Sequence, residues 1–303
     1  MLYLSTLNHD YVTDMNIKPP YLPLLLLTAY VVASCNNQRE QPATSELESP
    51  KTEFNTAYGS DTQQVYDLYL PANRSASTTK TVIVIHGGGW TSGDKNDVTG
   101  LVGLVQRALP DYAVVNMNYR LANGSTRKAF PDQITDIQNL INNLVANQNE
   151  YGINGTFALY GISSGAHIAT LYAYTQNTDN RVKAVINMVG PVDFTDPYYL
   201  DNAGYQVVLN SLIDFSAYPA GFNASEIVSP ALQVTKSSPP TISFYGDADP
   251  VVPSSQLTRL DAALTSKNVA HTSTLYTGGH GNWNGVHYAD LQAQVKTFIG
   301  ENY

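Results

Sequence analysis

Hydrophobic residues follow two patterns along this chain, and the two patterns alternate. Short, almost continuous apolar runs are typical of strands that are buried on both faces of a parallel sheet. Such runs occupy residues 81–85, 113–117, 156–160, 184–189, 241–245 and 272–276. We therefore predict a buried strand at each of these positions.

Between these runs, apolar residues recur every three or four positions, as in helices that bury one face. The clearest example spans residues 132–147, whose apolar face consists of Ile134, Ile137, Leu140, Ile141, Leu144 and Val145. The same period predicts helices at residues 98–109, 164–174, 254–266 and 286–299. Strands that alternate with helices predict an α/β fold, with a mostly parallel central sheet and helices on both of its faces.

Two segments depart from this alternation. Residues 64–70 alternate between polar and apolar positions and end at Pro71, which predicts an outer antiparallel strand. Residues 193–238 form a long insertion that is rich in Tyr, Phe and Asn and only weakly periodic. Because irregular segments of this length are usually functional, we expect a lid-like insertion; a helical pair that only covers the sheet edge is the alternative.

Residues 1–34 have the features of a targeting segment. The apolar run at residues 22–33 is shorter than the roughly 20 residues that cross a bilayer. The sequence V-A-S-C at residues 32–35 resembles the lipobox of bacterial lipoproteins, in which the cysteine becomes the lipidated first residue. This resemblance implies lipidation of Cys35 and an exported bacterial lipoprotein, periplasmic or anchored in the outer membrane. Either Met1 or Met15 is the start, and the place of the apolar run favours Met15.

Residues 35–53 are polar and rich in Gln, Glu, Ser, Thr and Pro. A segment of this composition cannot bury enough apolar surface to offset the entropy lost on ordering. We predict a flexible tether here, followed by one domain at residues 54–303.

Composition excludes several classes of function. A net charge of −9 and a pI near 5.0 argue against nucleic acid as a partner, because phosphate binding needs clustered Lys and Arg. Cys35 is the only cysteine, so an intrachain disulfide and a thiolate metal cluster are impossible. The sequence contains neither H-E-x-x-H nor a cluster of His and Asp, so we expect no metal and no cofactor.

The sequence G-I-S-S-G at residues 161–165 lies between a predicted strand and a predicted helix. This is the context of a nucleophile elbow, in which a serine occupies a strained turn and glycines on either side prevent clashes. Ser163 is therefore the candidate nucleophile.

The sequence H-G-G-G-W at residues 86–90 directly follows a predicted strand. Consecutive glycines let backbone N–H groups turn toward the oxygen of a tetrahedral intermediate, so Gly88, Gly89 and Ser164 are the candidate oxyanion donors. The alternatives are a simple tight turn or a phosphate-binding loop, but no Gly-Lys-Ser/Thr follows.

A serine nucleophile needs a base, and the base needs an orienting carboxylate. Asp249 and His280 follow the strands at 241–245 and 272–276, in the order Ser, acid, His. We choose Asp249 over Asp247 as the acid. As the base we choose His280, which is flanked by glycines in a loop, over His271 and His287.

Taken in order, these motifs resemble the α/β-hydrolase esterases, in particular the hormone-sensitive-lipase-like carboxylesterases. Within them, the bacterial feruloyl and acetyl-xylan esterase-like (BD-FAE) group and its kynurenine-formamidase relatives are the most similar. The resemblance extends from about Gln64 to the C-terminus and rests on H-G-G-G-W-x-x-G-D-K (86–95), Y-R-L (119–121), F-P-x-x-x-x-D (130–136), G-I-S-S-G-A-H (161–167), S-P (229–230), P-P (239–240), D-x-D-P-V-V-P (247–253) and G-G-H-G (278–281). It implies a catalytic triad of Ser163, Asp249 and His280. Residues 164–166 read Ser-Gly-Ala, where many members have Ala-Gly-Gly.

Several neighbouring residues have two interpretations each. Trp90 and Trp283 either bind substrate, at the acyl and leaving-group sides respectively, or only pack locally. Asp94 with Lys95, and Arg120 with Asp136, are expected to be structural pairs. The aromatic residues of the insertion are candidates for binding sugar or aryl groups: Tyr198, Tyr199, Tyr205, Phe215, Tyr218 and Phe222.

These motifs predict a serine carboxylesterase that works through an acyl-enzyme, on small-molecule or polysaccharide esters such as acetyl or feruloyl esters. An arylformamidase or amidase and a serine peptidase are alternatives that use the same triad. A non-catalytic surface lipoprotein that binds carbohydrate is the alternative outside the enzymes. The acyl and alcohol specificity and the oligomeric state stay open.

Overall fold

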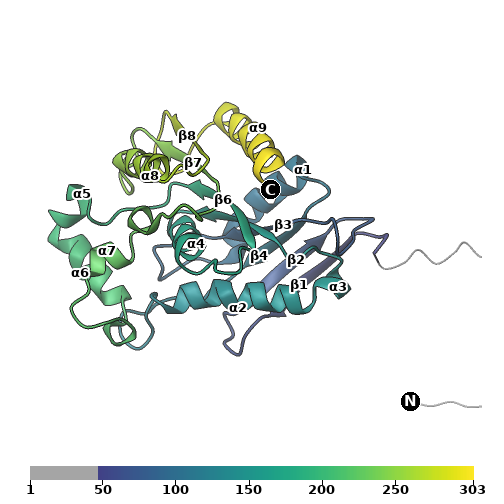
Figure 1. Cartoon of the computed structure of the whole chain (residues 1–303), viewed down its shortest axis with the longest axis horizontal. Helices are drawn as coiled ribbons and strands as arrows, with labels where there is room; N and C mark the ends of the chain where they lie inside the picture. The colour runs from purple at the N-terminus through teal and green to yellow at the C-terminus, as the bar shows by residue number, and fades with distance from the viewer. Residues whose placement is uncertain (1–46) are drawn as a thin grey trace, which may run out of the picture. The chain divides into compact units, whose positions relative to one another are not determined.

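The computed structural model describes residues 47–303 (Figure 1). The predicted targeting segment, the lipidation site Cys35 and most of the predicted tether therefore lie outside the described residues. Among the helices between residues 47 and 303, none combines the length and the apolarity that spanning a membrane requires.

The centre of the fold is an eight-stranded sheet with the order β1-β2-β4-β3-β5-β6-β7-β8. The strands from β4 to β8 are parallel, whereas β2 is antiparallel to both of its neighbours. The bounds are β1 Lys51–Ala57, β2 Val65–Leu70, β3 Thr81–Ile85, β4 Ala113–Met117, β5 Phe157–Ile162, β6 Val182–Met188, β7 Thr241–Gly246 and β8 His271–Tyr276. The predicted parallel strands and the α/β class are confirmed.

The strand predicted at residues 64–70 is β2, which is antiparallel as expected but is not the outer strand. β1 pairs with β2 and forms the edge, and it begins at Lys51, three residues before the predicted start of the domain. The β1 sequence, KTEFNTA, is mostly polar and partly exposed, because an edge strand covers little of the core. The hydrophobic pattern that reveals buried strands is therefore missing from it.

Helices cover both faces of the sheet. One face carries α1 (Thr99–Ala108) and α9 (Gly285–Asn302), which contact each other (Figure 1). The other carries α2 (Asp132–Ala146), α4 (Ser164–Thr175) and α8 (Ser255–Ser266). The short α3 (Gln148–Tyr151) follows α2, and the 3₁₀ helix η1 (Lys95–Val98) precedes α1.

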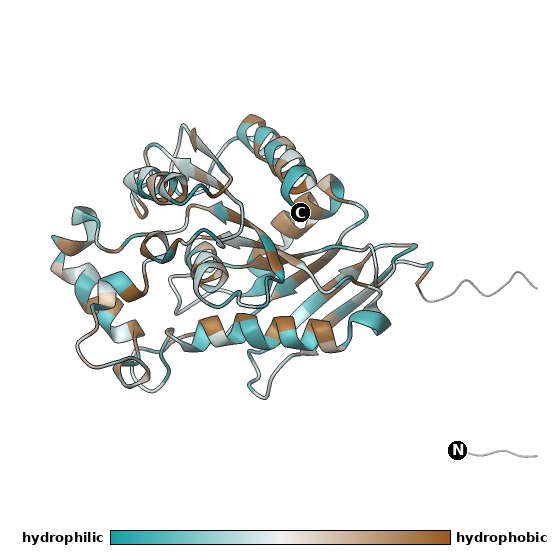
Figure 2. Cartoon of the chain, in the orientation of Figure 1, coloured by the Kyte–Doolittle hydropathy of each residue, from teal (hydrophilic) through white to brown (hydrophobic). Residues whose placement is uncertain are grey.

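Alternation along the strands divides the core into two layers. In β3, Val82 and Val84 face α1 and α9, whereas Ile83 and Ile85 face α2 and α4. All four side chains are buried, which explains why the strand reads as an unbroken apolar run. In the surface helix α2, by contrast, hydrophobic and hydrophilic residues alternate (Figure 2).

The insertion between β6 and β7 forms short helices: α5 (Pro197–Leu200), α6 (Ala203–Leu212), η2 (Phe215–Ala217), α7 (Ala224–Ile227) and η3 (Pro230–Gln233). The first four begin at an Asp or Asn whose side chain accepts a backbone hydrogen bond from the first turn: Asp196, Asn202, Asp214 and Asn223. The Asn-rich composition of the segment thus reflects repeated helix starts.

Candidate active site

The turn between β5 and α4 holds Ser163 in a strained conformation, with φ 55° and ψ −124°. The glycines on either side are sterically required. A Cβ at Gly161 would lie 2.4 Å from backbone atoms of Ala166, and one at Gly165 would lie 2.3 Å from the carbonyl oxygens of Ile85 and His86. The serine is therefore held where the strand, the helix and the β3 loop come closest.

The structure brings Ser163, His280 and Asp249 together from three loops. Nε2 of His280 lies 2.8 Å from Oγ of Ser163, and its Nδ1 lies 2.7 Å from Oδ2 of Asp249. With Nδ1 as the donor to the carboxylate, Nε2 is free to accept the serine proton. This is the arrangement that activates a serine as a nucleophile.

Asp249 is well placed to orient the imidazole. Its carboxylate is fully buried, and Oδ1 accepts hydrogen bonds from the N–H groups of Val251 (2.7 Å) and Val252 (3.0 Å). Burial alone would raise the pKa of Asp249, but the hydrogen bonds from His280 and from these two amides together lower that pKa below its usual value. The carboxyl group therefore stays ionised next to the imidazole.

The three rejected candidates lie elsewhere. Asp247 accepts a hydrogen bond from the N–H of Gly278 and so holds a turn. His271 contacts the carbonyl of Val269 at the start of β8, and His287 stacks on the ring of Tyr276.

Gly88 and Gly89 have positive φ angles, 121° and 58°. A Cβ at Gly88 would lie 2.0 Å from the carbonyl oxygen of Ser92, so only glycine fits there. Within residues 47–303, no group accepts a hydrogen bond from the N–H of Gly88, Gly89 or Ser164. These three amides are available to an oxyanion beside Ser163.

The loop that carries these glycines is held by Trp90, which also has a positive φ of 65°. The Trp90 carbonyl accepts hydrogen bonds from the N–H of Ala122 (2.9 Å) and from Nε2 of Gln133 (2.8 Å). The indole Nε1–H donates to Nδ1 of His167, 3.1 Å away. Both the backbone and the side chain of this residue are thus fixed.

His167 ends the G-I-S-S-G-A-H motif at residues 161–167, but no role for it follows from the sequence. It is fully buried on α4, one turn after Ser163, and its Nε2–H donates to the carbonyl of Val228. Desolvation by burial lowers the pKa of His167 to about 4. The ring is therefore neutral near pH 7, with Nδ1 free to accept the Trp90 bond. Its four-residue spacing places it one helical turn from the serine, but nothing in the sequence links it to Trp90.

The predicted pairs are only partly as expected. Arg120 and Asp136 form an ion pair, with Nη2 2.8 Å from Oδ1. Lys95, however, pairs with the buried Asp67 of β2, and Asp94 caps η1 instead. Both arrangements fix loops next to the site.

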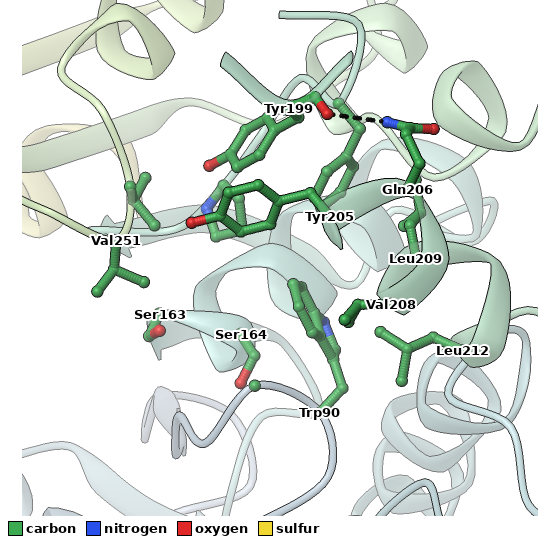
Figure 3. A pocket seen from close by; sticks show the side chains of 14 residues that line it. Trp90, Ser163, Ser164, Tyr199, Tyr205, Gln206, Val208, Leu209, Leu212 and Val251 are labelled. Carbon is green, nitrogen blue, oxygen red and sulfur yellow. Dashed lines mark hydrogen bonds between the residues drawn. The ribbon is translucent and has the colours of Figure 1, made fainter. Parts of the chain in front are cut away.

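An apolar pocket of about 140 Å³ opens beside Ser163 (Figure 3). Its walls come from the oxyanion loop, the start of α4, the Asp249 loop and the insertion, mainly α6. The apolar part of this wall includes Trp90, Phe194, Tyr199, Val208, Leu209 and Leu212. We call it the acyl pocket, after the role that we propose for it below.

Trp90 lines the acyl pocket, but Trp283 does not. Trp283 is buried on the α1/α9 side of the sheet and packs against Tyr276 and Tyr288. Of the aromatic residues of the insertion, Tyr199 and Tyr205 line the pocket, whereas Phe222 packs against Phe215 and Tyr218. Across the described residues, no group of three or more His, Cys, Asp or Glu side chains could hold a metal ion.

The chain is similar to known esterases. The model of the BD-FAE family matches residues 66–264. Esterase LipQ from Mycobacterium tuberculosis is 27% identical over 228 residues, which are 71% of this chain and 52% of that protein. Arylacetamide deacetylase from Bos taurus is 30% identical over 157 residues, 48% of this chain and 39% of that protein. The chain thus spans about half or less of the length of these curated relatives.

Solved structures share the fold. A truncated form of a carbohydrate esterase from gut microbiota superposes with a TM-score of 0.68 at 21% identity, covering 84% of this chain and 98% of that one. The eight-stranded sheet, the flanking helices and the elbow after β5 are those of the α/β-hydrolase fold, as the sequence resemblance implied.

Proposed function

Because the chain belongs to the BD-FAE family of α/β-hydrolase esterases, we propose that it is a serine carboxylesterase whose catalytic triad is Ser163, His280 and Asp249. One observation carries this proposal above the others. The imidazole of His280 bridges the serine hydroxyl and a buried carboxylate, with hydrogen-bond distances of 2.8 and 2.7 Å. That geometry matches the requirements for removing a proton from serine.

In the acylation step, Ser163 Oγ attacks the ester carbonyl carbon while His280 Nε2 takes the hydroxyl proton. The carbonyl oxygen becomes an oxyanion, which the free amides of Gly88, Gly89 and Ser164 stabilise. The bond to the alcohol oxygen then breaks, and the imidazolium returns its proton to that oxygen. The ionised Asp249 stabilises the imidazolium between these two transfers.

In the deacylation step, water takes the place of the alcohol. His280 removes a proton from the water, whose oxygen attacks the acyl carbon and forms a second oxyanion in the same site. The bond from that carbon to Ser163 Oγ breaks, and the serine regains its proton from the imidazolium. The acid product leaves, and the enzyme is unchanged.

We propose that the acyl group is apolar and larger than acetyl. The acyl pocket is lined by aromatic and aliphatic side chains, and α6 closes its far side with Leu209 and Leu212 (Figure 3). An apolar chain or ring gains free energy by leaving water there, at about 25 cal/mol per Å². An acetyl group would leave most of this surface without contact.

Two measurements test the proposal. Ser163→Ala should lose at least about 10⁴-fold in kcat on p-nitrophenyl butyrate, because the residual rate comes from binding and the oxyanion amides alone. A fluorophosphonate probe should label the native protein and not this variant. Ser266→Ala, an exposed serine at the end of α8, is the matched control and should retain both labelling and activity. Labelling of the Ser163→Ala variant at another serine would refute the triad.

A substrate panel then separates acyl from alcohol preference. It contains acetyl, butyryl, long-chain and feruloyl esters of simple alcohols, together with acetylated and feruloylated xylan. The polysaccharide substrate stays a prediction; in its favour is the fold shared with a carbohydrate esterase. An amide analogue in the same panel tests the amidase alternative.

We also propose export and lipid anchoring at Cys35, on the strength of the V-A-S-C sequence at residues 32–35. Metabolic labelling of expressing cells with an alkyne fatty acid should mark the full chain, and Cys35→Ser should lose the label. Equal labelling of the two proteins would overturn this proposal.

A further inference from the structure

A second hollow, of about 430 Å³, lies on the other face of the sheet from the acyl pocket. It opens between η1, the start of α1 and the start of α9. Helices α1 and α9 contact each other and lie side by side in Figure 1. Its apolar lining comes from Val98, Leu101, Leu104, Ile162, Met188 and Tyr288. These residues belong mostly to the α1/α9 core, whereas the walls of the acyl pocket belong to the α2/α4 core. We call this second hollow the α1/α9 groove.

Residues that line the groove contact the backbone next to Ser163 and next to His280. Ile162 directly precedes Ser163, whose N–H donates to the carbonyl of Met188 at 2.8 Å. On the other side, the Tyr288 hydroxyl donates to the carbonyl of Gly281, the residue after His280, at 2.6 Å. A Cβ on Gly281 would lie 3.1 Å from Cε of Met188, so the histidine loop rests directly on the floor of the groove.

The direction of each substituent at the reacting carbon follows from this arrangement. The oxyanion must face the amides of Gly89 and Ser164, and both residues also line the acyl pocket. The leaving oxygen must instead face His280, because that residue protonates it. The histidine loop lies over the α1/α9 groove. The alcohol part of the ester therefore leaves the serine on the side of the histidine loop, which is the side of the α1/α9 groove.

We propose that the α1/α9 groove is the binding site for the alcohol part of the ester, and that it takes an apolar alkyl or aryl alcohol. This proposal rests on the proposed esterase function. Six apolar side chains line the groove, and no cationic side chain does. Its one charged lining residue, Asp97, is exposed and disfavours an alcohol that carries a phosphate or carboxylate.

Trp283 acquires a role in this arrangement. The sequence left Trp283 either on the leaving-group side or as a packing residue, and in the structure it packs against Tyr288, with ring centroids 6.0 Å apart. It supports the aromatic wall of the groove without lining it.

Gly100 gives a clean way to fill the groove. It lines the groove in the first turn of α1, and no atom lies within 4 Å of the place where its Cβ would be. Gly100→Trp should therefore fold and occupy the groove with an indole ring. Arg107→Trp, on the exposed side of the same helix, controls for an added tryptophan. Leu104→Ala enlarges the groove and should act in the opposite direction.

The assay compares kcat/KM for butyrate esters that differ only in their alcohol: methanol, 1-hexanol and 2-naphthol. In Gly100→Trp, the ratio of 2-naphthyl to methyl ester should fall at least about tenfold, and in Leu104→Ala it should rise. The ratio of butyrate to acetate methyl esters should not change in Gly100→Trp. The control variant Arg107→Trp should behave like the native protein in both ratios.

Two results would overturn the assignment and can be told apart from failure of the proposed function. An unchanged alcohol ratio in Gly100→Trp would show that the groove does not hold the alcohol. A change in the acyl ratio with an unchanged alcohol ratio would show that it holds the acyl group instead. If the native protein hydrolyses none of these esters, it is the proposed esterase function that fails.

Discussion

The hydrogen bond between Trp90 and His167 should control the rate of catalysis, although His167 contacts neither pocket. His167 is fully buried, and its Nδ1 accepts the indole N–H of Trp90, the residue that follows Gly89. We choose His167→Gln as the perturbation, because the longer side chain keeps a donor near the Val228 carbonyl but removes the acceptor at the Nδ1 position. The Trp90 N–H would then lack its partner.

The size of the effect follows from two contributions. Leaving a buried donor unpaired costs about 1–3 kcal/mol of stability. Removing one oxyanion donor altogether typically lowers kcat by about 10²–10³-fold, so a loop that is only displaced should lose about tenfold. KM should change little, because His167 does not line the acyl pocket. His167→Asn, whose side-chain oxygen can take the Nδ1 position, should restore most of the rate.

The assay combines urea denaturation with steady-state kinetics on p-nitrophenyl butyrate for His167→Gln, Trp90→Phe and the double variant. If the two side chains act through one hydrogen bond, the double variant should be less damaged than the sum of the single variants by about 0.5–3 kcal/mol. Additive losses would show that no coupling exists. A His167→Gln protein with reduced stability but native kcat would show that the bond only holds the fold together.

Three further predictions follow from the geometry. The pKa of His167 is about 4 in the folded protein and about 6.5 in the unfolded chain, so between these pH values the unfolded state binds more protons. The free energy of unfolding should therefore fall by about 2 kcal/mol from pH 7 to pH 5. Urea midpoints measured at the two pH values should show this loss, and the loss should be smaller in His167→Asn. Asp249→Asn should fold but lose about 10⁴-fold in kcat, whereas Asp247→Asn should lose less than about tenfold, and equal losses would reject Asp249 as the acid. Gly165→Ala should lower the free energy of unfolding by more than about 3 kcal/mol in thermal or urea unfolding, because the added Cβ would lie 2.3 Å from two carbonyl oxygens. Gly300→Ala in α9 is the control and should be neutral or stabilising, because no atom lies within 4 Å of its added Cβ.

The sequence predicted those parts of the fold in which local structure requires a particular kind of residue. Buried strands read as apolar runs, and Gly161 and Gly165 mark the elbow because no side chain fits at either position. The order Ser, acid, His located three loops that meet at the same edge of the sheet. These signals are local, so they survive without knowledge of the tertiary structure.

What the sequence did not predict depends on contacts between distant segments. Lys95 pairs with Asp67 of β2, 28 residues away, and nothing in either local sequence identifies the other as its partner. His167 looked like an ordinary helix residue until the fold placed it under Trp90, 77 residues earlier in the chain. Partners of this kind are set by strand order and helix packing, which a single sequence does not contain.

The strained backbone positions at the site are held by hydrogen bonds from neighbouring elements. Ser163 and Trp90 are both non-glycine residues with positive φ, a state that costs of order 1–3 kcal/mol each. Each is held by bonds from several elements: Ser163 by the Met188 carbonyl and the N–H of His167, and Trp90 by three bonds to its carbonyl and indole. Because His167 takes part in both sets, through its backbone to Ser163 and through its ring to Trp90, it ties the Ser163 turn and the loop of Gly88 and Gly89 into one rigid unit. The site is therefore ordered before substrate binds. The free energy that this order requires comes from folding, so the reaction itself needs no rearrangement of the site.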